Sequence, residues 1–262
     1  MLGIDCHAHL THITDAIAVI EESRKKLRGI ISVTAELEHA QQSFTFSRLH
    51  PGFVFTSLGF HPEHCKRYSS EQIDDYIDFI KKHRDGIIAL GETGIDYNWV
   101  TEKEEQEKSK HVFVTMIELA NELVLPLQIH ARNGAKTTAF SDCLRLLADH
   151  GAKNVMMHCF SGSDEELKQA LDLGYYISFA TIICRSKKHQ RLAAATPLER
   201  MLLETDAPWL DPYSREPTNR PWNIFESAKI IAELNGTTPE HVLTTTEQNA
   251  KDLFNLSISP TS

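Results

Sequence analysis

Short apolar runs rich in β-branched residues alternate with longer amphipathic stretches along the whole sequence. The apolar runs, which predict strands, cover residues 2–9, 29–34, 53–60, 87–91, 125–130, 154–160, 175–180 and 201–206. The amphipathic stretches, which predict helices, include residues 15–27, 70–83, 102–123, 141–150 and 164–173. Because strands buried on both faces form continuous apolar runs and are joined by helices, this alternation predicts βαβ units and a parallel sheet.

The number of repeated units predicts how the sheet is organised. Roughly eight strand–helix units within 262 residues favour an α/β fold of the closed (β/α)8 TIM barrel type over an open doubly wound sheet. Residues 239–254 predict a final helix that caps the barrel, and residues 257–262 have the composition of a loose tail. Because no low-complexity linker interrupts the sequence, we expect one barrel domain over residues 1–256, followed by that tail.

Charge and composition limit the classes of function. The net charge of −9 at pH 7 argues against a broad basic surface for duplex nucleic acid. The five cysteines form no CxxC pair, which predicts reduced thiols in a cytosol-like compartment. No signal-like segment opens the sequence, and no apolar run approaches the roughly 20 residues of a membrane span. We therefore expect a cytoplasmic protein with no membrane partner.

Two histidines in the first apolar run give the first indication of chemistry. The sequence of residues 4–10 is Ile-Asp-Cys-His-Ala-His-Leu, so His7 and His9 are spaced i, i+2. On an extended strand this spacing points both imidazoles to the same face. Imidazole is the commonest protein ligand for metals, and two of them on one face form half of a metal site.

Further metal-type residues occur where later apolar runs end, and in a parallel barrel those strand ends face the active site. With the first pair they make four histidines and two carboxylates on five predicted strands: His7, His9, Glu92, His130, His158 and Asp206. This set is large enough to hold two divalent ions, with one carboxylate bridging them. Mixed imidazole and carboxylate ligands suit Zn, Mn, Fe, Co or Ni, and Mg less well.

Two neighbours of these residues are expected to play supporting parts. Glu204 alternates with Asp206 and shares its predicted face, so we expect it to support the site or to pack beneath it. Cys159 follows His158 directly, and strand alternation predicts that it faces away from the site as a small core residue.

Seven short motifs, in order over nearly the whole length, resemble those of a known family. They are Ile-Asp-Cys-His-Ala-His at 4–9, Gly-Phe-His-Pro at 59–62, Gly-Glu-Thr-Gly-Ile-Asp-Tyr at 91–97, Pro-Leu-Gln-Ile-His-Ala-Arg at 126–132, His-Cys-Phe-Ser-Gly at 158–162, Tyr-Ile-Ser-Phe at 176–179 and Leu-Glu-Thr-Asp-Ala-Pro at 203–208. With these motifs the chain resembles the TatD-type metal-dependent deoxyribonucleases of the amidohydrolase superfamily. The resemblance implies a distorted TIM barrel, in agreement with the strand pattern, and hydrolysis of DNA phosphodiester bonds.

The resemblance also implies a role for each matching position. The ligands it implies are His7, His9 and Asp206 for one metal ion, His130 and His158 for a second, and Glu92 as the bridge between them. His61 and Arg132 lie in motifs that resemble the phosphate-facing positions of the family, so we expect both to bind substrate. The chain departs from the family pattern at Thr11 and over residues 133–136, which bears on the shape of the substrate groove and on no implied ligand.

These residues support a two-metal mechanism, in which a water activated by both ions attacks phosphorus in line with the leaving oxygen. Asp206 is the candidate general base, and Glu92, as the bridge, is the second residue that we expect to be essential for catalysis. Arg132 carries a permanent charge in a bidentate geometry that suits a phosphate oxygen.

Aromatic residues in predicted loops beyond the strand ends could stack on unpaired bases. They are Tyr97, Trp99, Trp209 and Trp222, of which we select Tyr97 and Trp209 as substrate-binding residues. We expect a 3′–5′ exonuclease acting on single-stranded DNA or frayed strand ends, with DNA as its partner and no protein partner implied.

Two other classes of function fit parts of the sequence. Another hydrolase of the same superfamily would act on a small amide, lactone or phosphoester, but many such sites bridge their metals with a carboxylated lysine where this chain has Glu92. A metal-holding scaffold would retain ions without turnover, and a full set of six ligands on an open face argues against it.

Overall fold

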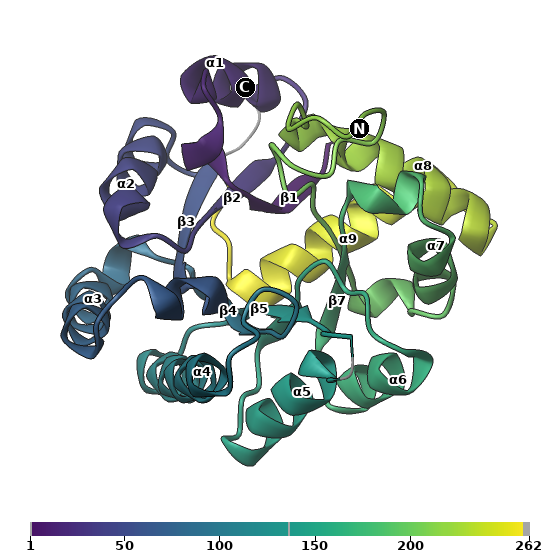
Figure 1. Cartoon of the computed structure of the whole chain (residues 1–262). Helices are drawn as coiled ribbons and strands as arrows, with labels where there is room; N and C mark the ends of the chain where they lie inside the picture. The colour runs from purple at the N-terminus through teal and green to yellow at the C-terminus, as the bar shows by residue number, and fades with distance from the viewer. Residues whose placement is uncertain (1, 136, 259–262) are drawn as a thin grey trace.

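The computed structural model describes residues 2–135 and 137–258, which contain one eight-stranded sheet. Its strands lie in chain order and each pairs in parallel with the next: β1 (Ile4–Ala8), β2 (Gly29–Thr34), β3 (Val54–Phe60), β4 (Ala89–Asp96), β5 (Leu127–Arg132), β6 (Val155–Met157), β7 (Tyr176–Phe179) and β8 (Met201–Leu203). With helices around it, the sheet forms a nearly closed barrel, which confirms the predicted (β/α)8 TIM fold (Figure 1). Within the predicted tail at 257–262, residues 259–262 lie outside the described residues.

Helices follow the strands and surround the sheet. The α-helices are α1 (Ala16–Arg24), α2 (Ala40–Leu49), α3 (Ser70–Lys82), α4 (Lys103–Leu123), α5 (Ala139–Asp149), α6 (Asp164–Asp172), α7 (Lys187–Ala194), α8 (Ile224–Asn235) and α9 (Pro239–Phe254). The short 3-10 helices are η1 (Leu10–His12), η2 (Leu37–His39), η3 (Pro62–Lys66), η4 (Arg84–Gly86), η5 (Thr181–Cys184), η6 (Leu198–Arg200) and η7 (Pro221–Asn223). Among the described helices, none combines the length and apolar character needed to cross a membrane.

Helix α3 illustrates how local sequence sets these elements. Ser69 caps its first turn, because the Ser69 hydroxyl accepts from the Gln72 N–H while the Gln72 side chain accepts from the Ser69 N–H. The helix then buries Ile73, Tyr76 and Ile80, which recur at helical spacing and pack into the large apolar cluster between the helices and the sheet. Its polar face remains exposed.

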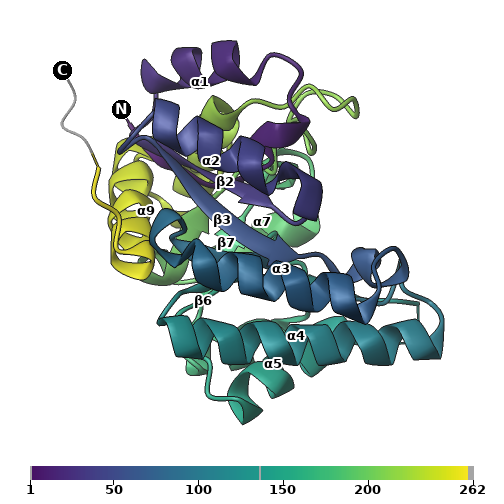
Figure 2. The same ribbon diagram turned by 90° about the vertical axis from the view of Figure 1, so that its left-hand side faces the viewer.

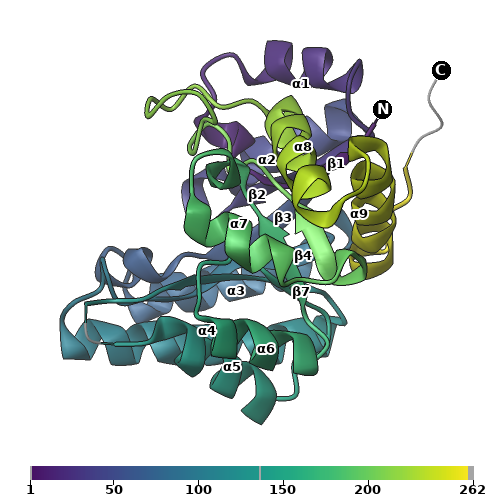
Figure 3. The same ribbon diagram turned by 90° about the vertical axis from the view of Figure 1, so that its right-hand side faces the viewer.

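Helix α9 closes one end of the barrel, as the sequence predicts. Ala250, Leu253 and Phe254 of α9 pack into one apolar cluster with side chains from the barrel strands: Ile4, Cys6, Ile31, Val33, Ala89, Met156 and Leu202. Figures 2 and 3 show α9 at the end where the N-terminus lies, with the long β-to-α loops at the opposite end. Any site inside the barrel therefore opens only toward those loops.

Loop backbone joins β8 to β1 at the open end. The Asp206 N–H donates to the His7 carbonyl oxygen at 2.9 Å, and the His9 N–H donates to the Ala207 carbonyl oxygen at 2.7 Å. These bonds place the segment after β8 beside the end of β1. The first and the last of the sequence-predicted site residues are neighbours for this reason.

Candidate metal centre

His7, His9 and Asp206 form one group of donor atoms at the open end of the barrel. The Nε2 atoms of His7 and His9 lie 3.2 Å apart. Asp206 Oδ1 lies 3.2 Å from His9 Nε2 and 3.8 Å from His7 Nε2. One ligand atom from each residue lies within 4.8 Å of the other two, which is the spacing of side chains that share a metal ion.

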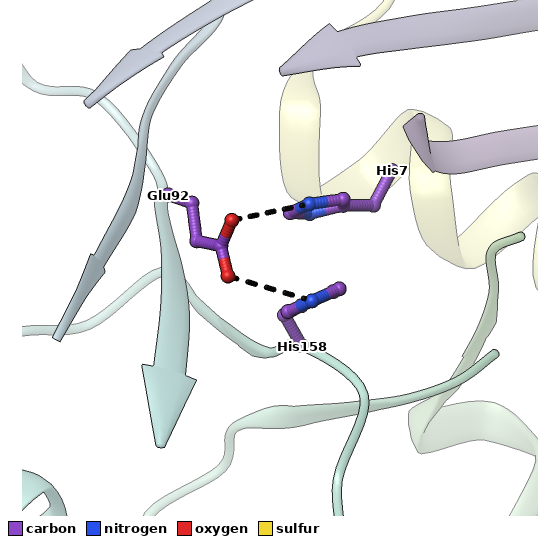
Figure 4. A group of neighbouring side chains, drawn as sticks. All are labelled: His7, Glu92 and His158. Carbon is purple, nitrogen blue, oxygen red and sulfur yellow. Dashed lines mark ion pairs between the residues drawn. The ribbon is translucent and has the colours of Figure 1, made fainter. Parts of the chain in front are cut away.

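Glu92 faces this group and two further histidines. Its Oε2 is 3.7 Å from the Nε2 atoms of both His7 and His9. Its Oε1 is 2.6 Å from His130 Nδ1 and 3.6 Å from His158 Nε2. Figure 4 shows the carboxylate extended toward His7 with one oxygen and toward His158 with the other. The ring of His158 also stacks on that of His7, with centroids 3.6 Å apart, so one buried carboxylate faces a continuous set of histidines.

The outward ring nitrogens of the histidines are held by acceptors. His7 Nδ1 lies 2.8 Å from Gln128 Oε1, and His158 Nδ1 lies 2.9 Å from Glu204 Oε2. Because each acceptor oxygen takes an N–H, the neutral ring presents the lone pair of Nε2 to the centre.

His130 is held in the opposite orientation. Its Nε2 lies 2.9 Å from Asp96 Oδ2, so Nδ1 is the nitrogen that faces Glu92. Gln128 and Asp96 lie within strand motifs, and sequence reasoning gave them no role. Glu204 supports the site as predicted.

The charges of the centre stabilise one another. Burial alone would raise the pKa of Glu92, but the charge of His158 and the hydrogen bonds of His130 and His7 hold it well below its ordinary value. Burial would likewise raise the pKa of Asp206, and the hydrogen bond and charge of His9 with the charge of His158 lower it. Two ionised carboxylates in a buried set of imidazoles need positive charge nearby, which protonated rings or divalent cations supply. The donor set therefore fits divalent metal ions.

The carboxylates in turn raise the pKa values of two of the histidines. Burial lowers the pKa of His130, but the hydrogen bonds of Asp96 and Glu92 raise it overall to about 9. Burial also lowers the pKa of His158, and the charges of Glu204 and Glu92 raise it overall to about 10. A cation bound at the centre would take the place of these protons.

Glycines in β4 allow Glu92 to reach the centre. Gly94 has φ +151°, and a Cβ at this position would lie 1.9 Å from the His130 carbonyl oxygen of β5. The pairing of β4 with β5 shifts between Leu90 and Thr93, so the strand bends where Glu92 emerges. We expected Glu92 just past a strand ending at residue 91; β4 instead runs on to Asp96, and Glu92 lies inside it.

The position of Asp206 depends on Asp5, a buried residue close to His7 in sequence. It lies beyond the end of β8 with φ +59°, a left-handed conformation that a non-glycine residue adopts at a cost. Asp5 Oδ1 accepts from the Thr205 N–H at 2.9 Å, and Asp5 Oδ2 accepts from the Thr205 hydroxyl at 2.5 Å. Asp5 thereby fixes the residue that precedes Asp206.

A cavity of about 570 Å³ opens over the centre and is lined by several of the predicted substrate-binding residues. His61 is buried in its wall with Nε2 4.0 Å from Glu92 Oε1, and burial lowers the pKa of His61 to about 3. Arg132 lies at its edge, with its guanidinium carbon 4.8 Å from the centroid of the Trp99 ring. Trp99 and Trp209 also line the cavity and are 46% and 40% exposed, respectively.

Two of the four aromatic residues considered for base stacking lie away from the cavity, and one of them, Tyr97, was selected as substrate-binding. Tyr97 is 7% exposed, its hydroxyl donates to Asp142 of α5, and it does not line the cavity. Because β4 extends to Asp96, Tyr97 follows the strand directly and packs in the core instead of reaching the loop end. Trp222 lies against the apolar core with Lys26 Nζ 4.2 Å above its ring, away from the cavity.

Cys159 is not a core residue that faces away from the site, because it is half-buried and is one of the residues that line the cavity. Strand β6 ends at Met157, and Cys159 has φ +42°, so strand alternation no longer applies there. The Cys159 N–H donates to Glu204 Oε1 at 2.7 Å, which ties this turn to the carboxylate that orients His158.

Comparisons with known proteins agree with the fold and the site. The family model described as TatD related DNase matches residues 4–255. Deoxyribonuclease TATDN3 of Homo sapiens is 32% identical over 265 aligned residues, which cover 96% of this chain and 94% of that protein. The 3′–5′ ssDNA/RNA exonuclease TatD of Erwinia tasmaniensis is 30% identical over 251 residues, covering 92% of this chain and 94% of that protein. The solved structure of YJJV, a TatD homolog from Escherichia coli, has a TM-score of 0.86 at 23% identity and covers 97% of this chain and 98% of its own.

The barrel and its buried set of histidines and carboxylates define a metal-dependent hydrolase. The chain belongs to the family of TatD related DNases, which matches it over almost its whole length. This membership confirms the family resemblance seen in the sequence motifs.

Proposed function

We propose that this protein is a metal-dependent deoxyribonuclease that removes nucleotides from the 3′ end of single-stranded or frayed DNA. The observation that carries the proposal is the position of Glu92, whose buried carboxylate lies within 4 Å of His7, His9, His130 and His158 beneath one open cavity. The name of the Erwinia relative, a 3′–5′ exonuclease of single-stranded DNA and RNA, supports the polarity and the substrate.

The ligands assigned to each ion follow the family resemblance of the sequence motifs. We assign one ion to His7, His9 and Asp206, a second to His130 and His158, and the bridge to Glu92. When bound, two divalent ions neutralise charge on the phosphoryl oxygens and lower the pKa of a water molecule. The imidazole and carboxylate donors suit Zn, Mn, Fe, Co or Ni better than Mg.

Residues of the chain would position the phosphodiester and move the proton. Asp206 has the more exposed of the two central carboxylates, with 17% of its side chain accessible against 6% for Glu92, so it is the one that can accept a proton from attacking water. As the new oxygen–phosphorus bond forms, the bond to the leaving sugar oxygen breaks. Arg132 would pair with a phosphate oxygen from the edge of the cavity.

The shape of the open end favours an unpaired strand. Because α9 closes the other end, substrate enters only from the loops. Trp99 and Trp209 are the exposed aromatic residues lining the cavity in the described part of the chain, and each could stack on one base. A strand end or a single strand can pass between such rings, whereas an intact duplex keeps its bases stacked inside.

The test uses oligonucleotides labelled at either end, in single-stranded, double-stranded and circular form, with each divalent metal added in turn. A 3′–5′ exonuclease gives a ladder of shortened products from 5′-labelled single strands and releases the label of 3′-labelled strands as mononucleotide. Asp206→Asn abolishes the reaction, whereas Asp74→Asn, an exposed change on α3, leaves it intact. Equal cutting of intact circular duplex, or normal activity of Asp206→Asn, would overturn the proposal.

A further inference from the structure

A second cluster of metal-type side chains lies beside the candidate metal centre. His12 ends η1, the turn that follows β1. Glu36 directly precedes η2, the turn that follows β2, and His39 ends it. Because β1 and β2 are adjacent parallel strands, the two turns meet at the open end of the barrel. One ligand atom from each of the three residues lies within 4.8 Å of the other two.

The donor atoms of this cluster converge on the Glu36 carboxylate. His12 Nε2 lies 3.2 Å from Glu36 Oε1, and His39 Nδ1 lies 3.6 Å from Glu36 Oε2. The second distance is too long for a hydrogen bond, and His39 Nδ1 is a buried atom with no hydrogen-bond partner. A buried nitrogen left unpaired costs free energy, and a cation between it and the carboxylate would remove that cost.

A third histidine faces the same carboxylate. His64 Nδ1 lies 3.0 Å from the Ala35 carbonyl oxygen, which can only accept, so Nδ1 carries the proton in the neutral ring. The lone pair of His64 therefore belongs to Nε2, which lies 4.0 Å from Glu36 Oε1. Three imidazoles around one carboxylate match the ligand types and number of a tetrahedral transition-metal site.

The surroundings keep Glu36 available as a ligand. Its side chain is 18% exposed, and its Oε1 and Oε2 lie 3.2 Å and 3.3 Å from His12 Nε2. The cluster has no residue in common with the candidate metal centre and adjoins it, with the ring centroids of His12 and His9 6.0 Å apart. His12, Glu36 and His64 line the same cavity as Glu92.

We propose that His12, Glu36 and His39, with His64 as the fourth ligand, form a separate binding site for a divalent transition-metal ion at the rim of the cavity. The donor set favours Zn, Co or Ni over Mg or Ca. The site is distinct from the two positions assigned around Glu92 and does not depend on the nature of the substrate.

Metal content tests the proposal directly. The full chain is stripped with a chelator, reloaded with Zn²⁺ or Co²⁺, dialysed and analysed for bound metal per chain. We expect about three ions in the unchanged protein and about two in each of Glu36→Gln and His39→Ala. His111→Ala is the matched control, because His111 is an exposed imidazole on α4 and its loss leaves the count unchanged.

The two variants keep the test informative if one of them fails to fold. His39 has a side chain that is 33% exposed in a short turn, so His39→Ala disturbs little packing. Equal metal content in the unchanged protein and in folded His39→Ala or Glu36→Gln would overturn the proposal, as would loss of an ion in His111→Ala. Because ions are counted, failure of the proposed DNA hydrolysis would leave this result unaffected.

Discussion

The two ends of the barrel are formed by the same strands and have opposite chemistry. At the α9 end, Ile4, Val33 and Leu253 belong to one apolar cluster that excludes water. At the loop end, His7 and Glu92 are buried among ionisable partners. Apolar burial stabilises the first end, whereas burial of charge at the second costs free energy that only specific partners offset. The comparison indicates that one end maintains the fold and the other is kept for chemistry.

The change between the two ends coincides with irregular strand pairing. β2 and β3 pair without interruption from Ile30 to Thr34, and no metal-type residue lies on either strand. The pairing of β1 shifts between Asp5 and Ala8, and that of β4 shifts between Leu90 and Thr93. Such shifts redirect side chains, and these two strands supply His7 and Glu92.

The largest effect is expected from Glu92→Gln, which keeps the volume of the side chain and removes its charge. DNA hydrolysis should fall on the order of a thousandfold, because the substitution removes the charge proposed to bridge two metal ions. Steady-state rates at saturating metal measure this change. Glu240→Gln, an exposed substitution at the α9 end, should keep full activity; retention of more than a tenth of the activity by Glu92→Gln would contradict the account.

The opposite result is expected at the closed end. Leu253→Ala removes buried apolar volume from the cluster under α9 and should lower the free energy of unfolding by about 3 kcal/mol. Urea unfolding measures this loss. The activity and metal content of the folded variant should remain unchanged, and a variant that loses metal while keeping its stability would show that the two ends are not separate in function.

A smaller effect on metal binding is expected from Glu204, which orients a proposed ligand and is not itself assigned as one. Glu204→Gln weakens the acceptor that holds His158 Nδ1, so metal affinity should fall by about 10- to 100-fold. Competition with a chelator of known affinity measures the change. Glu199→Gln, exposed on η6, is the matched control. Equal metal affinities of the two variants would show that Glu204 does not contribute to metal binding.

The smallest effect is expected at the cavity wall. Trp209→Ala should raise KM for single-stranded DNA by about tenfold with little change in kcat, since one stacking contact is lost. Tyr97→Phe should leave KM unchanged and lower the free energy of unfolding by about 1 kcal/mol, because its hydroxyl bonds to Asp142. A raised KM for Tyr97→Phe with an unchanged KM for Trp209→Ala would mean that Tyr97, and not Trp209, contacts the substrate.

Much of the fold and the central donor set can be predicted from sequence, because both depend on local pattern. The i, i+2 spacing of His7 and His9 gives a shared face, and polar residues after apolar runs mark the open end of a parallel barrel. His130 and His158 were found in this way, and the structure brings both within 4 Å of Glu92.

The remaining features depend on tertiary contacts that leave no local signal. Gln128 and Asp96 orient their histidines from neighbouring strands, and nothing in their own sequence context marks that role. Gly91 and Gly94 interrupt the apolar run of β4, so the sequence predicts an early end of the strand and does not show that Tyr97, in the turn that follows, is buried. The cluster around Glu36 was missed because its members are separate polar residues in two turns, which meet only in the barrel.

The central proposal is that Glu92 binds two cations at once. Anomalous diffraction from crystals of the zinc- or manganese-loaded protein tests this most directly. We expect two peaks on either side of the Glu92 carboxylate, about 3.5–4 Å apart, one beside His9 and Asp206 and the other beside His130. A single peak, or ions that make no contact with Glu92, would contradict the account.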